Sequence, residues 1–374
     1  MKINVYPPKN MMLHAYLLFF IIINTQVGVG IFTFQRVVYE ASMRDAWISV
    51  IVAGLVTHLI MWLIVRTLQK YKSADLFGIH YDLYGKWIGM VFNLLYIVYY
   101  FLVTFAVMRN YSSVVQAWIF PDIPTWVLIL LISCLAFYAA MGGIRVIVGI
   151  CLFSFIVTLL TVLLFHSSIQ HAIWTQLLPV LDSSSWDIMN GAVRMGFSLA
   201  GFEIISVIYP FILNKNRVML HSQLAVLFSN VLYLFIMVIS IGYFAPDQLL
   251  RSLWPSLNML KIVEYPYLER LEFIVISAWM LVILSGILLN TWLITRGCKR
   301  MWKLNPKPVL IAVFFIILLM SFVFHKRLEV KDFMIRLEVS SIFFSFIYPA
   351  LLCCIVFIVF AWRKKKQRKG GEHT

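Results

Sequence analysis

The chain carries little charge. Asp, Glu, Lys and Arg make up 13% of its 374 residues, about half of the roughly 25% that is typical of soluble domains. Hydrophobic residues make up 62% of the sequence. This balance excludes a soluble globular protein and indicates an integral membrane protein whose apolar segments face lipid.

Cysteine is scarce, and patterns that carry catalytic chemistry are missing. The five cysteines lie mostly in apolar stretches at unrelated spacings, which argues against a disulfide framework and against a metal site. The sequence has no nucleophile with a nearby base, no phosphate-binding loop and no metal-ligand spacing. We therefore expect neither an enzyme nor a bound cofactor or metal.

Ten apolar segments are long enough to cross a bilayer, and prolines and charges separate them. The predicted spans are residues 11–38, 45–66, 87–118, 125–141, 145–166, 188–213, 218–244, 270–295, 308–324 and 339–362. Two stretches between spans have a different character. Residues 246–268 predict short helices over a cavity mouth, and residues 325–338 predict a helix lying in the membrane interface. Residues 1–374 thus form one all-α membrane domain.

The basic residues are distributed asymmetrically. An even number of spans places both termini on one side, and that side holds 20 of the 31 Lys and Arg residues but only 3 of the 16 Asp and Glu residues. Basic loops mark the cytoplasmic side, so we expect both termini in the cytoplasm. Membrane orientation therefore explains the net charge of +15 without a nucleic-acid partner. The basic tail, residues 363–374, is suited to anionic membrane lipid.

The first span is interrupted near its middle. Residues 24–34 read Asn-Thr-Gln-Val-Gly-Val-Gly-Ile-Phe-Thr-Phe. A glycine in a helix interior costs about 1 kcal/mol relative to alanine, and a freed backbone group in hydrocarbon costs several kcal/mol unless it is satisfied. A break at Gly28 and Gly30 therefore predicts a cavity that holds a polar solute or ion. The alternative is that the glycines only allow close helix packing.

The sixth span repeats the interruption. Gly196 and Gly201 bracket Ser198 in its middle, and Glu203 follows. If residues 11–166 and 188–362 are two five-helix repeats, the broken spans are equivalent. Matching breaks in two halves favour a five-plus-five inverted-repeat transporter fold with the ligand between them.

The ends of the half-helices suggest which ligand fits. Amides from Gly30 through Ile31 to Thr33 would begin the outer half-helix and suit a carboxylate. Carbonyls near Thr25 and Gln26 would suit an ammonium group or a cation. A zwitterionic amino acid meets both requirements. The predicted ligand-binding residues are Thr25, Gln26, Gly28, Gly30, Ile31, Tyr96, Tyr100, Ser198 and Gly201.

Several polar side chains lie within predicted spans. Glu203 is a carboxylate deep in the sixth span, where it must be protonated or paired. It serves either in proton coupling, ligand contact or a gating pair, or in a structural hydrogen bond to a neighbouring helix. Tyr96, Tyr99 and Tyr100 lie on the third span, and one of them is a candidate wall for a ligand. Tyr96 and Tyr100 share a face of that span. We expect His58 and Asn230 to form interhelical hydrogen bonds.

The stretch around the first break resembles a known family. Its Gly-x-Gly-Ile-Phe string, residues 28–32, is similar to the first-helix signature of the amino acid–polyamine–organocation (APC) transporter superfamily, which has the LeuT-like fold. Residues 27–50, including Asp-Ala-Trp-Ile at 45–48, resemble the B subunit of the GerA-type nutrient germinant receptors of spore-forming Bacilli. Gln35 departs from the proline common in that family. The resemblance extends over the whole chain in length, span count and basic tail.

The resemblance implies a receptor built on a ten-helix transporter fold. Such a subunit sits in the inner membrane of the dormant spore and works with a larger A subunit and a lipoprotein C subunit. It senses a small-molecule nutrient, which can be an amino acid, a sugar or a nucleoside, and commits the spore to germination. Two alternatives stay open, namely a proton-coupled amino acid permease of the same superfamily and a scaffold whose pocket has lost its ligand.

Overall fold

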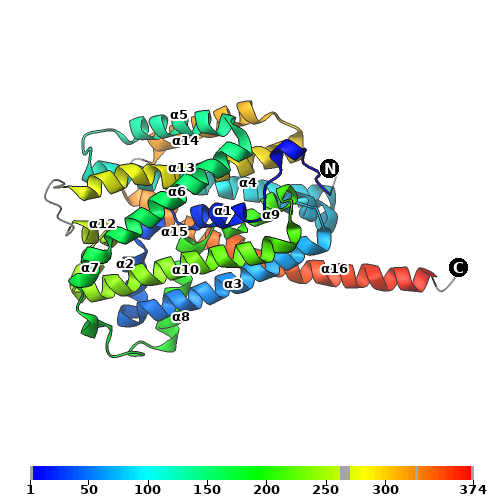
Figure 1. Cartoon of the computed structure of the whole chain (residues 1–374). Helices are drawn as coiled ribbons and strands as arrows, with labels where there is room; N and C mark the ends of the chain where they lie inside the picture. Colours follow the sequence, from blue (N-terminus) through cyan, green and yellow to red (C-terminus); the bar gives the residue numbers. More distant parts are fainter. Residues whose placement is uncertain (1–2, 262–269, 325–326, 372–374) are drawn as a thin grey trace.

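The computed structural model describes residues 3–261, 270–324 and 327–371, and in these ranges every regular element is a helix (Figure 1). The α-helices are α1 (Leu17–Gln26), α2 (Phe34–Ser42), α3 (Ala46–Tyr71), α4 (Leu76–Trp118), α5 (Thr125–Met141), α6 (Gly143–Leu164), α7 (His166–Gln170), α8 (Ser185–Leu199), α9 (Ile205–Ile208), α10 (Val218–Tyr243), α11 (Pro246–Arg251), α12 (Pro255–Leu260), α13 (Leu271–Trp302), α14 (Pro306–Val323), α15 (Arg327–Ile342) and α16 (Tyr348–Gly371). Short 3₁₀ helices are η1 (Lys9–Met11), η2 (Val29–Phe32), η3 (Met43–Asp45), η4 (Trp174–Leu177), η5 (Phe202–Ile204), η6 (Tyr209–Phe211) and η7 (Lys215–Arg217), and η8 (Phe343–Ile347) is a π-helical turn.

Seven helices in the described ranges are long and apolar enough to cross a membrane. An eighth is added if α8 and the segment Phe202–Phe211, which meet at a bend of 50°, count as one span. The first and fourth predicted spans contain shorter apolar helices, α1 and α5. The all-helical membrane class is therefore confirmed, while the count of ten spans stays a prediction.

Some helix boundaries match the predicted spans, whereas α4 begins 11 residues early and α13 ends seven residues late. Helix α5 occupies the predicted span 125–141, and α10 ends one residue before the predicted end of its span, at 244. Helix α4 begins where the Asp75 carboxylate accepts a hydrogen bond from the Gly78 amide at 2.9 Å. Its regular geometry is interrupted at Gly85 (φ 77°), just before the predicted span that starts at 87.

The prediction of a separate interfacial helix at residues 325–338 is wrong in extent. Residues 325–326 lie outside the described ranges, and α15 continues through η8 into α16, so that Glu329–Lys365 forms one apolar helix. The predicted short helices of residues 246–268 are present as α11 and α12. Residues 262–268 of that prediction lie outside the described ranges.

Helix α1 lies in the middle of the bundle. It packs against α6, α10 and α13, while α3 packs against α8 and α10 (Figure 1). Helices α5 and α14 pack together at one edge. The broken first span is therefore surrounded by other helices, as a backbone break at membrane depth requires.

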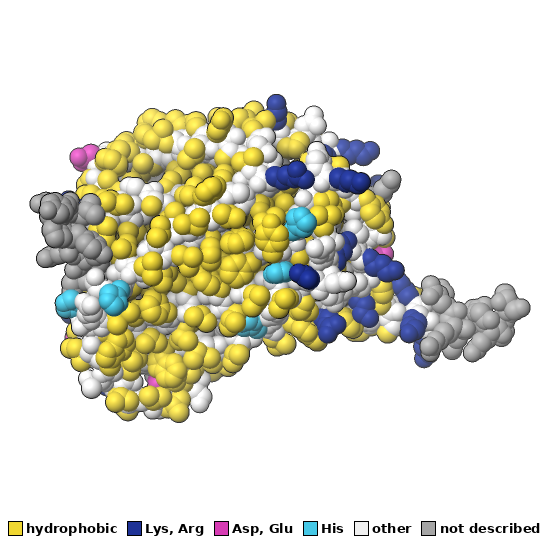
Figure 2. All heavy atoms as spheres, viewed as in Figure 1, with side chains coloured by type: hydrophobic (Ala, Val, Ile, Leu, Met, Phe, Trp, Pro, Cys, Tyr) yellow, Lys and Arg dark blue, Asp and Glu magenta, His cyan; other side chains and the backbone are white. Residues whose placement is uncertain are grey.

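The outer surface of the bundle is apolar along its length. Hydrophobic side chains cover the face seen in Figure 2, and Lys and Arg side chains gather at the end that carries both termini. Large apolar side chains such as Phe153, Leu163 and Val339 are more than 60% exposed. An apolar belt of this kind suits a lipid environment.

The end of the bundle that carries the termini is closed by the N-terminal segment. The Val5 amide donates to the Ser73 carbonyl at 2.9 Å, and the Leu13 amide donates to the Phe211 carbonyl at 2.8 Å. The fully buried Asp75 carboxylate lies 3.0 Å from Arg300. The two backbone hydrogen bonds join the first residues of the chain to the connection between α3 and α4 and to η6.

Candidate functional site

The helix in the first predicted span is interrupted between Gln26 and Phe34. Helix α1 ends at Gln26, and the chain passes through Gly28 (φ −129°, ψ −141°) into η2 before α2 starts at Phe34. The outer half therefore begins with a 3₁₀ turn, and the Thr33 amide donates to the Gly30 carbonyl at 3.0 Å. One of the amides assigned to a carboxylate ligand is thus already bonded.

The sixth span is broken at Gly201. Helix α8 ends at Leu199, and Gly201 adopts a left-handed conformation (φ 105°) before η5 and α9. A Cβ atom at Gly201 would lie 2.6 Å from the Thr25 carbonyl oxygen. Both the backbone angle and this close approach require glycine, and the approach shows that the two breaks touch.

Side chains from each break hold the backbone of the sixth span. The Gln26 side-chain Nε2 donates to the Leu199 carbonyl at 2.7 Å, which satisfies the end of α8. The Glu203 Oε2 atom accepts the Gly201 amide at 2.8 Å. Gln26, from the first break, and Glu203, from the second, thereby both stabilise the interruption at Gly201.

Carbonyls around the first break are also bonded. The bonds run from Tyr233 Oη to Gln26 O (2.9 Å), from Ser256 Oγ to Ile31 O (2.7 Å) and from Trp279 Nε1 to Gly28 O (3.4 Å). The Gln26 carbonyl, assigned from the sequence to an ammonium group, therefore already accepts a hydrogen bond. These donors come from α10, α12 and α13, far along the chain, and no sequence pattern marks them.

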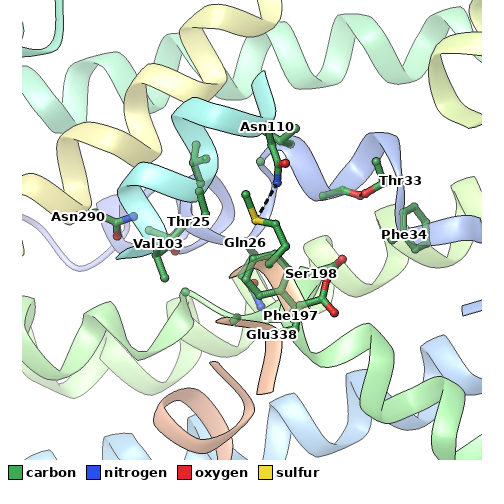
Figure 3. A pocket seen from close by; sticks show the side chains of 18 of the residues that line it. Thr25, Gln26, Thr33, Phe34, Val103, Asn110, Phe197, Ser198, Asn290 and Glu338 are labelled. Atoms are coloured by element: carbon green, nitrogen blue, oxygen red, sulfur yellow. Dashed lines mark hydrogen bonds between the residues drawn. The ribbon is translucent and has the colours of Figure 1, made fainter. Parts of the chain in front are cut away.

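A cavity of about 300 Å³ lies between the two breaks, α4 and α15 (Figure 3). The predicted site residues that line it are Thr25, Gln26, Gly28, Gly30, Tyr100, Ser198, Gly201 and Glu203. Figure 3 shows Thr25 and Gln26 from the first break and Ser198 from the second around the same space. The structure therefore brings together residues that are up to 178 positions apart, from Thr25 to Glu203.

Two predicted residues lie elsewhere. Ile31 is buried at 3% exposure and is not part of the cavity wall. Tyr96 donates from its hydroxyl to the Phe344 carbonyl of η8 at 2.9 Å and lines a separate space of about 10 Å³ with Ser206. Tyr99, one residue short of Tyr100, lines the main cavity in its place.

The sequence interpretation missed further residues of the cavity wall. Val103, Ala106 and Asn110 line it from α4, on the helical face that continues from Tyr99. Glu338 was missed because its segment was interpreted as interfacial. Asn290 of α13 also lines the cavity, and no pattern in the sequence marks it.

Charge is unevenly placed in the cavity. Arg194 forms an ion pair with Glu40 at 3.1 Å, where both side chains are partly exposed. Glu338 is partly buried, and Glu203 is only 2% exposed. The described wall therefore carries two carboxylates, Glu203 and Glu338, and one basic side chain, Arg194.

The interhelical bonds expected from two polar side chains are present. His58 Nδ1 is hydrogen-bonded to Gln223 Oε1, and Asn230 Nδ2 donates to the Gly54 carbonyl at 3.2 Å. Both bonds connect α3 to α10. This pair of predictions is confirmed as structural.

Comparison with known proteins relates the chain to spore germination proteins. A family model described as spore germination protein matches residues 12–330. Spore germination protein GerQB of Bacillus cereus is 30% identical over 344 residues, which cover 92% of this chain and 95% of the relative. Spore germination protein A2 of Bacillus subtilis (strain 168) is 23% identical over 297 residues, 78% of this chain and 81% of the relative. YndE, a spore germination protein of the same strain, is 22% identical over 354 residues, 93% and 96% of the two chains.

Proposed function

The chain belongs to the spore germination protein family, as a germinant receptor subunit of the B type, and we propose that it binds a small nutrient, an amino acid, between its broken helices to trigger germination. The observation that carries this proposal is the cavity on which both breaks meet. Its volume of about 300 Å³ is at the lower end of the range for small-molecule sites. Such a size suits a metabolite better than a peptide.

We propose in addition that the fold is a ten-span inverted repeat. In this arrangement α1 and α2 together form the first span, α5 forms the fourth, and residues 11–166 and 188–362 are the two repeats. The contact between Gly201 and the Thr25 carbonyl supports it, because the first span of each half then meets its counterpart at the break.

The subunit would act in a complex. The proposed partners are a larger A subunit and a lipoprotein C subunit in the inner membrane of the spore. A proton-coupled permease would use the same cavity, but the relatives that match the chain are named for germination, so the receptor function is the better supported one.

Deletion of this chain tests the receptor function against the permease. Spores that lack it should lose the response to at least one nutrient, measured as the fall in optical density during germination, and reintroduction of the chain should restore that response. Vesicles containing the chain and energised with a proton gradient should not accumulate that nutrient above control vesicles. Accumulation together with normal germination of the deletion strain would instead establish a permease.

We propose that both termini are cytoplasmic, from the basic residues that gather at their end of the bundle (Figure 2). An epitope placed after residue 374 should be protected from antibody in intact cells and exposed in permeabilised cells. An epitope inserted at Asp182, between α7 and α8, should be accessible in both. The reverse pattern would invert every loop of the proposed topology.

A further inference from the structure

The long apolar helix Glu329–Lys365 contains one turn that is not α-helical. In this turn, η8, the Tyr348 amide donates to the carbonyl of Phe343, five residues earlier. A bond to the fifth residue encloses one residue more than the α-helical bond to the fourth. Helix α15, which precedes the turn, therefore lies one residue out of register with an α-helix extended back from α16.

Pro349 explains why the wider turn occurs at this place. In an α-helix the proline ring clashes with the carbonyl of the residue four positions earlier, and proline has no N–H to donate to it. For Pro349 that carbonyl belongs to Ser345, in the middle of η8. A π turn moves this carbonyl away from the ring, so the local sequence favours it over a regular α turn.

Tyr96 of α4 satisfies the carbonyl that Pro349 leaves free. In the π pattern the residue at position 349 would donate to the Phe344 carbonyl, but proline cannot. The Tyr96 hydroxyl donates to that carbonyl at 2.9 Å, and Tyr96 and Pro349 line the same small space. The Tyr99 hydroxyl lies 3.2 Å from the Ser345 Oγ atom. Helix α4 thus supplies the hydrogen bonds that the turn needs at membrane depth.

The register of α15 decides which of its side chains reach the main cavity. Met334 and Glu338, four residues apart, line the cavity, and the Met334 sulfur accepts Asn110 Nδ2 at 3.7 Å (Figure 3). The residues that follow them, Ile335 and Val339, are 48% and 66% exposed. If η8 became α-helical, α15 would turn by about 100°, and these two apolar residues would take the wall positions.

We infer that Pro349 and Tyr96 are positioning residues that fix the register of α15 over the cavity. Neither lines the cavity, so each acts through the π turn. The turn places Glu338, a carboxylate, on the cavity wall and keeps an apolar face of α15 on the outer surface. The register itself is independent of the proposed function, whereas its effect on the nutrient response rests on that function.

The Pro349→Ala variant tests the register directly. Alanine restores the N–H and removes the ring, so η8 should become α-helical. The readout is labelling of Met334→Cys and Ile335→Cys, each in the full-length chain, by a permanently charged methanethiosulfonate applied to isolated membranes and quantified at that residue by mass spectrometry. With Pro349 present, Met334→Cys should be labelled in preference to Ile335→Cys. With Pro349→Ala the preference should reverse.

Deletion of one residue from the turn should reverse the effect of the substitution. Removing Phe343 from the Pro349→Ala chain takes out the residue that the π turn accommodates, so α15 returns to its native register. Pro349→Ala alone should raise the half-maximal nutrient concentration about tenfold at an unchanged subunit level, and the additional deletion should recover the native labelling and most of the sensitivity. A purely destabilising effect of Pro349→Ala predicts a further loss instead.

Pro308→Ala is the matched control. Pro308 lies in the first turn of α14, where its missing N–H has no partner within the helix, so labelling and nutrient response should stay native. If Pro349→Ala does not accumulate in the membrane, Tyr96→Phe decides. This variant removes only the hydroxyl and should shift labelling from Met334→Cys toward Ile335→Cys by a smaller amount.

The register and the proposed nutrient site fail in different ways. Native labelling in both Pro349→Ala and Tyr96→Phe, at native subunit levels, would overturn the positioning role and leave the nutrient site untouched. Reversed labelling in Pro349→Ala with an unchanged nutrient response would uphold the positioning role and argue against the cavity as the nutrient site.

Discussion

Gly201→Ala should remove most of the protein from the membrane. Gly201 has φ 105°, a conformation that costs a non-glycine residue about 1–3 kcal/mol. The added methyl would also lie 2.6 Å from the Thr25 carbonyl oxygen, and that oxygen belongs to backbone at the centre of the bundle, which has little freedom to move. We expect the subunit level on immunoblots of spore membranes to fall at least tenfold, with the nutrient response falling in parallel.

Gly196→Ala is the matched control on the same span. A Cβ atom there would lie 3.5 Å from Ile342 and 3.7 Å from Phe346, which is ordinary van der Waals contact, and alanine is the better helix former. Its subunit level should equal that of the native chain. Equal levels of both variants would show that the contact between the two breaks is not required for folding.

Gly30→Leu should abolish the nutrient response while the protein still assembles. Gly30 lines the cavity, and a Cβ atom there would lie 3.2 Å from the Ser198 Oγ atom. A leucine side chain would extend further into the space between the breaks and would favour an unbroken helix. The measurement is germination against nutrient concentration in spores whose subunit content is equalised by immunoblot.

Smaller changes at the same contact should give graded results. Gly30→Ala should reduce sensitivity only mildly, because the neighbouring atom is the end of a serine side chain. Adding Ser198→Ala removes that atom and leaves ordinary contacts of 3.6 Å and 3.7 Å, so the double variant should recover part of the loss. A fully responsive Gly30→Leu variant would leave helix packing as the reason for the glycine.

Composition and glycine positions were enough to predict the broken spans. Leucine-rich, isoleucine-rich and phenylalanine-rich segments in lipid have few alternatives to a helix, so α5 and α10 match their predicted bounds. A glycine pair inside such a segment has few explanations besides a break or close packing. The breaks at Gly28 and Gly201 follow from that limited choice.

Rotation of a helix about its own axis could not be predicted in the same way. Tyr96 and Tyr100 share a face, but the cavity lies against the face that runs from Tyr99 to Asn110. In a soluble helix the polar face would fix this rotation. Helix α4 carries polar and apolar residues on more than one face, so its pattern does not mark the side that meets the cavity.

Long-range hydrogen bonds were equally hidden. Tyr233 donates to the Gln26 carbonyl across a separation of 207 residues, and Ser256 donates to the Ile31 carbonyl across 225. Tyrosine and serine are common in membrane helices, so their residue types alone do not assign them to a break. Only the three-dimensional arrangement shows which carbonyls remain for a ligand.

The backbone contact at Gly201 also defines a point about which the two interrupted segments can rotate. Because no side chain separates Gly201 from the Thr25 carbonyl, the backbones of the two interrupted segments meet here directly. If one segment rotates against the other, displacement is smallest at this contact and grows with distance along the helices. A nutrient bound beside this contact would shift the backbone close to the point of rotation. Sub-ångström changes in the cavity would then become larger movements at the membrane surfaces.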